Sequence, residues 1–262
     1  MTSFLKTLPD PWGIYSVWWR HFQVYRSTWL VNFLPPMSEP IVYLTAFGYG
    51  LTPLVGEVAY GGGTVPYQQF IAPGMVAIGV LFQSYVEGAF STFIRLNFQR
   101  TWQALLTAPL SYLDVFFGDW FWAATKGIIA GVLTGVVAAI AGLYRLQDLI
   151  LSLPLIVLGS LLFGAFGLLS AGLVRKVDQI NVPLFIVIIP MFTLCGTYFP
   201  RDTLPPTLQT IAGVLPLASL VDLLRWPMGV PDHWLLSLLW LVVCLVGIAI
   251  AAAKKIYPLL FR

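Results

Sequence analysis

The chain has 262 residues and a formal net charge of +3, and its charged fraction of 10% is far below the roughly 25% of an average soluble domain. Hydrophobic residues make up 58% of the sequence and come in runs of helix length, whereas a membrane β-barrel would show short alternating segments. This composition excludes an ordinary cytosolic enzyme, a disordered chain and a disulfide scaffold. The sequence also contains no block of basic residues that would suggest binding to nucleic acid. We therefore predict an all-α polytopic membrane protein.

Residues 1–28 are expected to form a cytoplasmic N-terminus with an amphipathic helix lying flat on the membrane surface. Aromatic residues recur there at spacings of three and four and so share one helical face: Trp12, Tyr15, Trp19 and Phe22. Aromatic rings and arginine suit the headgroup layer. The alternative interpretation is a simple aromatic belt ahead of the first span. The segment lacks the features of a cleaved signal peptide.

Residues 29–262 are expected to form the transmembrane domain, because they contain six apolar runs that match the roughly 20 residues of a span. The predicted spans are residues 29–51, 70–93, 115–143, 149–174, 182–199 and 234–253. With both termini inside, the outer loops carry only Arg145, Arg201 and Arg225 among the basic residues. This asymmetry predicts that both termini and the loop 95–111 face the cytoplasm.

Between the fifth and sixth spans, residues 207–230 are apolar but interrupted by prolines. Pro205, Pro206, Pro216 and Pro227 break the run too often for a seventh span, yet the run is too apolar for a solvated loop. Two short re-entrant helices that dip into the outer leaflet are expected, with their irregular backbone shielded by protein or lining a wet cavity.

Three ionisable residues stand out inside the predicted spans, where a buried charge points to function: Glu39, Glu87 and Lys126. Glu39 lies between prolines and is expected to cap a helical turn. Glu87 and Lys126 lie on the inner halves of consecutive antiparallel spans and pair in one interpretation; in the other, Lys126 extends to the cytoplasmic headgroups.

Glycines at four-residue spacing, Gly127, Gly131 and Gly135, predict a close approach of another helix. Packing within the subunit is the favoured interpretation and a subunit interface the alternative. No Walker A pattern occurs, and His21 and His233 have no neighbours at metal-ligand spacing. We therefore expect no cofactor and no metal in this chain.

The loop 95–111 contains apolar residues although the charge count places it in water. Trp102, Leu105 and Leu106 are expected on a short helix that docks on a partner, since exposed apolar groups mark partner surfaces. Arg95 and Arg100 flank them and are expected to orient the partner through its acidic groups.

Several strings follow one another along nearly the whole chain: Glu39-Pro-Ile-Val-Tyr-Leu, Phe47-Gly-Tyr-Gly-Leu, Ala72-Pro-Gly-Met75, Gln99-Arg-Thr-Trp-Gln-Ala-Leu-Leu, Trp122-Ala-Ala-Thr-Lys126 and Asp222-Leu-Leu-Arg225. In this order they resemble the membrane subunit of ABC-2 type ABC exporters. The branch that they resemble most is that of the nodulation-factor export permeases, whose members export lipo-oligosaccharides.

The resemblance implies a complex of two copies of this chain with two ATP-binding cassette ATPases in a bacterial inner membrane, with ATP and Mg held by the ATPases and lipids around the permease. It also implies a coupling helix whose ATPase-contacting residues are Arg95, Arg100, Thr101, Trp102, Gln103, Leu105 and Leu106. Gln103 stands where family members often carry Glu, so no salt bridge is implied there. The re-entrant helices are expected to gate the exit.

The family architecture places the substrate path along the first, second and fifth spans. Its aromatic walls are expected to comprise Tyr43, Phe47, Phe82, Tyr85 and Tyr198. The expected function is outward movement of a lipid-linked glycan or lipo-oligosaccharide, by a permease that is not itself an enzyme. Export of a small amphipathic drug is the alternative cargo; an intramembrane lipid-glycan-modifying enzyme and a structural scaffold are the alternative classes.

Overall fold

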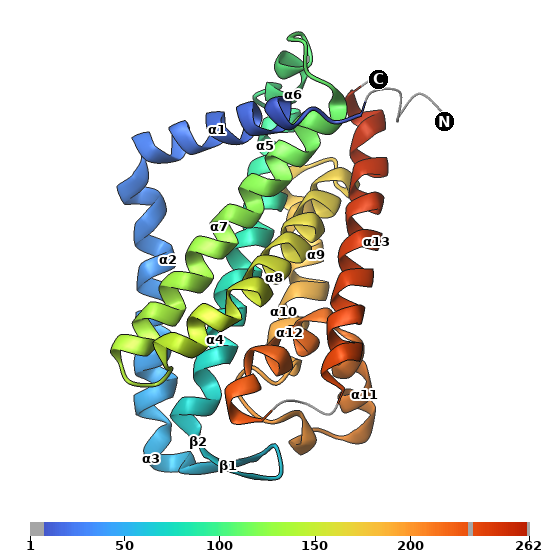
Figure 1. Cartoon of the computed structure of the whole chain (residues 1–262). Helices are drawn as coiled ribbons and strands as arrows, with labels where there is room; N and C mark the ends of the chain where they lie inside the picture. The colour runs from blue at the N-terminus through green and yellow to red at the C-terminus, as the bar shows by residue number, and fades with distance from the viewer. Residues whose placement is uncertain (1–7, 230–232, 261–262) are drawn as a thin grey trace.

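The computed structural model describes residues 8–229 and 233–260, except for the side chains of residues 35–37, 39 and 40. Long helices run side by side, and α1 (Pro11–Ser27) lies crosswise over one end of them (Figure 1). This end also carries the short helix α6 (Thr101–Leu105) and the last turns of α13 (Trp234–Leu260), and we call it the α6 end. The opposite, hairpin end carries a small β-hairpin.

Helix α1 begins where the Asp10 side chain accepts a hydrogen bond from the backbone N–H of Trp12. Its inner face repeats at a spacing of four, with Gly13, Val17 and His21 buried, while the Trp12 side chain on the other face is 72% exposed. The structure thus contains the predicted amphipathic helix with its aromatic side turned away from the bundle.

The first predicted span consists of α2 (Trp29–Tyr43) and the π-helical η1 (Leu44–Gly50). A short α3 (Thr52–Val55) leads to strands β1 (Glu57–Tyr60) and β2 (Gly63–Pro66), paired from Glu57–Pro66 to Tyr60–Gly63. Gly61 and Gly62 both have positive φ, as the tight two-residue turn of a hairpin requires. The chain therefore forms a tight hairpin turn at these two glycines.

The centre of the bundle is a continuous helical stretch, formed by α4 (Tyr67–Val86), η2 (Glu87–Ser91) and α5 (Thr92–Asn97). It packs against α7 (Tyr112–Ile140) and α8 (Leu146–Leu173). The glycines at four-residue spacing on α7 allow this close packing, because a Cβ on Gly127 would lie 1.7 Å from Ser84 Oγ of α4. The favoured interpretation of these glycines, packing within the subunit, agrees with this contact.

The fifth predicted span is shifted toward the α6 end. It consists of η3 (Val177–Ile180), α9 (Asn181–Pro183), η4 (Leu184–Ile188) and α10 (Ile189–Leu194), so it covers residues 177–194 where 182–199 was predicted. The helix stops at Cys195 because Gly196 adopts φ +80°. The last span α13 continues beyond the predicted residue 253, through Lys254 and Lys255 to Leu260.

Two short helices, α11 (Pro206–Val214) and α12 (Pro216–Leu224), follow the small turn η5 (Arg201–Thr203) and are bent by 86° relative to each other. They lie toward the hairpin end, ahead of η6 (Trp226–Met228), as the predicted re-entrant pair would. Among the described residues five stretches are long and apolar enough to cross a membrane, or six if this pair counts as one. The first predicted span, residues 29–51, is not among these five.

Candidate functional site

Five ionisable side chains meet inside the α6 end, and we call them the charge cluster: His21 of α1, Glu87 of η2, Arg95 of α5, and Asp119 and Lys126 of α7. Asp119 is completely buried, and the exposed fraction of Arg95 is only 8%. An isolated charge at such a depth is costly, so its partners decide whether the fold tolerates it.

Arg95 lies at the centre of the charge cluster. Its Nη2 lies 2.8 Å from Glu87 Oε1, its Nε 3.3 Å from Asp119 Oδ1, and its Nη1 3.1 Å from His21 Nδ1. A guanidinium can only donate hydrogen bonds, so His21 Nδ1 must be the accepting nitrogen. The proton of His21 is then on Nε2, which lies 2.9 Å from Asp119 Oδ1. With His21 neutral, two carboxylates balance two cations.

Neutral side chains also donate hydrogen bonds to both carboxylates. Thr92 Oγ1 and Trp102 Nε1 donate to Asp119 Oδ2 at 2.8 and 3.2 Å. Trp122 Nε1 donates to Glu87 Oε1 at 3.0 Å. The charge cluster is therefore a paired and hydrogen-bonded network that connects α1, α5, α6 and α7, which is the condition under which buried charge is stable.

Glu87 and Lys126, proposed as a pair from the sequence, lie within ion-pair distance. Lys126 Nζ is 3.8 Å from Glu87 Oε2, 3.2 Å from Asn32 Oδ1 of α2 and 4.8 Å from the centre of the Tyr25 ring. Glu87 is nonetheless closer to Arg95, which the sequence interpretation had assigned elsewhere. The side chain of Glu39 lies outside the described residues.

The sequence interpretation of the loop 95–111 was wrong for Arg95 and Trp102. Only 1% of Trp102 is exposed, because its indole is buried against α7 and bonded to Asp119. Arg95 is held in the charge cluster, so neither side chain faces a partner. Thr101 is also buried, and Gln103 Nε2 donates to the carbonyl of Leu96 at 3.3 Å.

What α6 presents to its surroundings is a smaller surface than predicted. Arg100 is exposed and adopts φ +50° just before the helix, while Leu105 and Leu106 are half-buried. The large apolar side chain that stands out is Phe98, 65% exposed, which the sequence analysis did not single out. Its signal was available, since it is an aromatic residue in a loop placed in water. We call Phe98 and Arg100 the loop tip.

Four of the five proposed path residues lie in one chain of aromatic rings. Ring centres are 6.0 Å apart for Tyr43 and Phe47, and 5.0 Å for Phe47 and Tyr198. Phe192 of α10, which the sequence analysis missed, continues the chain to Tyr198 at 6.2 Å and to Phe82 at 5.2 Å. Tyr85 does not belong to this chain of rings, because its side chain is fully buried in the core.

At the hairpin end, α12 is fixed to α4 by a buried arginine. Arg225 Nε donates to the carbonyl of Phe70 at 3.1 Å, and the guanidinium lies 3.6 Å from the centre of the Phe70 ring. Arg201 forms an ion pair with Asp222 of α12. In the part of the chain that the structure describes, no group of three or more His, Cys, Asp or Glu side chains is placed to hold a metal ion.

Comparison with known proteins defines the class to which this fold belongs. The family described as "ABC-2 type transporter" matches residues 13–228, and the chain belongs to this family. It is the permease of an ABC-2 type transporter and a multi-pass membrane protein.

Individual proteins are similar to this chain over most of its length. "Nodulation protein J" of Rhizobium leguminosarum bv. trifolii is 37% identical over 210 residues, which are 80% of this chain and 79% of that protein. "Nodulation protein J" of Rhizobium meliloti (strain 1021) is 34% identical over 223 residues, 85% and 84% of the two chains. "Inner membrane transport permease YadH" of Escherichia coli (strain K12) is 24% identical over 218 residues, 83% of each.

Proposed function

We propose that this permease moves a lipid-linked glycan or lipo-oligosaccharide outward through a bacterial inner membrane. Two copies work with two separate ATP-binding cassette subunits, which hold the ATP and Mg, and both termini lie in the cytoplasm. The similarity to proteins named for nodulation supports the proposal that the cargo is a glycan of this kind. The apolar, aromatic faces of Tyr43, Phe47 and Tyr198 are compatible with sugar rings sliding past them.

The observation that carries the proposal is the charge cluster. It fastens the loop helix α6 through Trp102, and the crosswise helix α1 through His21, to Asp119 of α7. Displacement of the α6 end by an ATPase is therefore passed directly to a membrane-spanning helix. Coupling in this proposal runs through a buried network, with the exposed loop tip as the contact to the ATPase.

The enzyme alternative is less compatible with the same geometry. An intramembrane lipid-glycan-modifying enzyme needs a free acid, base or nucleophile facing a substrate site. In the charge cluster every described carboxylate, guanidinium and imidazole already has a partner within the subunit. A structural scaffold would not need buried charges that connect a loop helix to a span.

Co-purification tests the ATPase contact. Tagged permease is co-expressed with the candidate ATPase and recovered in one detergent. Three forms are compared: wild type, the loop-tip variant Phe98→Ala/Arg100→Ala, and the control Trp12→Ala. The control removes an exposed aromatic side chain from the outer face of α1. Wild type and the Trp12 control should retain the ATPase, and the loop-tip variant should lose most of it. Equal recovery with the loop-tip variant would place the contact elsewhere.

Transport in reconstituted vesicles tests the cargo. A fluorescent lipo-oligosaccharide and a small amphipathic dye are supplied to the same permease–ATPase complex with ATP. ATP-dependent movement of the lipo-oligosaccharide alone supports the proposal, whereas movement of the dye alone favours the drug-export alternative.

A further inference from the structure

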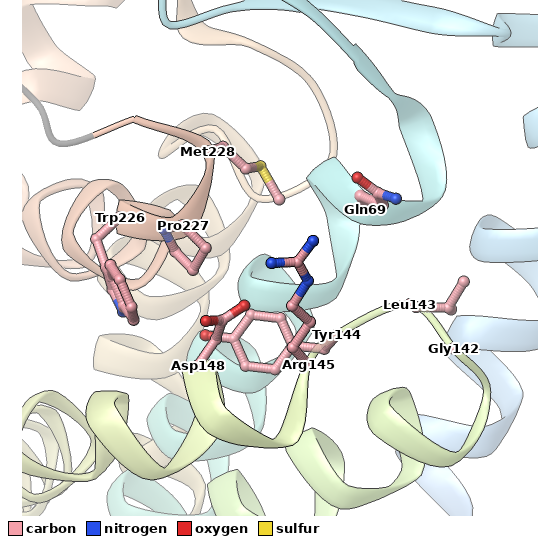
Figure 2. Close-up of a pocket in the computed structure, with 9 residues that line it drawn as sticks. All are labelled: Gln69, Gly142, Leu143, Tyr144, Arg145, Asp148, Trp226, Pro227 and Met228. Atoms are coloured by element: carbon pink, nitrogen blue, oxygen red, sulfur yellow. The ribbon is translucent and has the colours of Figure 1, made fainter.

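Three segments far apart in the sequence line a partly open cavity of about 330 Å³ at the hairpin end (Figure 2). They are the first turn of α4, the connection from α7 to α8 with the first turn of α8, and η6. The side chains that matter for its chemistry are Gln69, Tyr144, Arg145, Asp148, Trp226 and Met228. Its size falls at the small end of the roughly 300–1,000 Å³ of ligand pockets.

The floor and one wall of the cavity are fixed by the protein itself. Ser152 Oγ lies 3.0 Å from the Tyr144 hydroxyl and accepts a hydrogen bond from Trp226 Nε1 at 3.0 Å. The Tyr144 hydroxyl also donates to the carbonyl of Leu224 at 3.4 Å. These bonds within the protein join α8, the α7–α8 connection and η6, so the floor is held in place by the protein's own contacts and a ligand does not have to order it.

The polar side chains over this floor are uncommitted. Figure 2 shows the Arg145 guanidinium and the Asp148 carboxylate extending into the cavity, with Gln69 on the facing side. Among the residues that the structure describes, none of these three side chains has a hydrogen bond or an ion pair to another residue. Arg145 differs in this respect from Arg201 and Arg225 at the same end. Arg201 is paired with Asp222, and Arg225 donates hydrogen bonds to backbone carbonyls.

The balance of charges selects the ligand class. Asp148 disfavours an anion beside Arg145, and Arg145 disfavours a cation beside Asp148. A neutral molecule rich in hydroxyls can form hydrogen bonds with both charged side chains. Each of its hydroxyls can accept a hydrogen bond from the guanidinium or the Gln69 amide and donate one to the carboxylate. The flat forks of Arg145, Gln69 and Asp148 suit neighbouring hydroxyls on one ring.

We infer that this cavity binds a neutral sugar unit. The inference rests on the proposed function, in which a glycan leaves the membrane at the hairpin end, and it adds a place where the sugar portion is held after crossing. Trp226 and Met228 supply apolar surface for the faces of the ring, while Arg145, Asp148 and Gln69 supply the polar contacts.

Saturation-transfer NMR on the purified permease tests the inference without transport. The detergent must have no sugar headgroup, and the probes are neutral hexoses, N-acetylhexosamines and their disaccharides, with inorganic phosphate, sugar phosphates and the cationic hexosamines as charged comparisons. Wild type is compared with Arg145→Gln, Asp148→Asn and, as the control, Asp202→Asn, which removes an exposed carboxylate outside the cavity.

At least one neutral sugar should give a signal, with affinity falling about tenfold or more in the Arg145 and Asp148 variants, as expected when a charged hydrogen-bonding partner is removed. The Asp202 control should bind as wild type does. Silence from every neutral probe, binding that the two variants leave unchanged, or preference for phosphate would overturn the inference. Sugar binding without ATP-driven export would instead count against the proposed function and leave the cavity assignment standing.

Discussion

Removal of Arg95 is the sharpest test of the charge cluster. Arg95→Met keeps much of the side-chain volume but removes the cation that lies within 3.3 Å of both Glu87 and Asp119. Two buried carboxylates then face one cation, Lys126, which is 3.8 Å from Glu87. Breaking a buried pair by removing one member typically costs about 3–5 kcal/mol, and we expect the Arg95→Met loss of stability to fall in this range.

A second substitution should restore part of that loss. Asp119→Asn in the Arg95→Met background removes the unbalanced carboxylate and leaves Glu87 with Lys126. The double variant should therefore be more stable than Arg95→Met alone, with a coupling of about 0.5–3 kcal/mol, the size measured for contacting residues. The direction follows from charge balance, because each single variant leaves one buried charge in excess.

The assay is thermal or denaturant unfolding in one detergent, read by intrinsic tryptophan fluorescence, of wild type, Arg95→Met, Asp119→Asn, the double variant and Arg100→Met. Arg100→Met is the matched control, since Arg100 is exposed on the same loop and a surface substitution usually changes stability by no more than about 0.5 kcal/mol. Equal stability of Arg95→Met and Arg100→Met, or strictly additive effects of Arg95→Met and Asp119→Asn, would refute the reasoning.

Further predictions concern topology, the aromatic chain and helix packing. After replacement of the native cysteines, Gln99→Cys should react with an impermeant thiol reagent only from the cytoplasmic side and Thr203→Cys only from outside; the reverse pattern would invert the topology. Tyr198→Ala should reduce export while ATPase recovery and folded yield persist, and unchanged export would place the path elsewhere. Gly127→Ala should destabilise by about 1–3 kcal/mol, because its Cβ would overlap Ser84. Gly247→Ala, with open space at its Cβ, should not reduce the monodisperse yield in size-exclusion chromatography.

The charge cluster was only partly accessible from the sequence. Glu87 and Lys126 stood out because they are charged residues within apolar runs. Asp119 satisfied the same criterion, since it lies inside the predicted span 115–143, and it was overlooked among the surrounding aromatic residues. His21 was read as a residue at a span end, and nothing in its local pattern pointed to Asp119, 98 positions away.

The sequence by itself determined the membrane-spanning helices, the crosswise amphipathic helix and the broken pair after the fifth span. These follow from local properties, because a chain in lipid must satisfy its backbone hydrogen bonds within helices, and apolar length and proline positions set where helices run and stop. Only the tertiary structure decided that Arg95 and Trp102 point inward, that Tyr85 is core, and that Gln69, Arg145 and Trp226 share one cavity. The direction in which such a side chain points depends on which distant segment packs against it, and the local sequence pattern does not identify that segment.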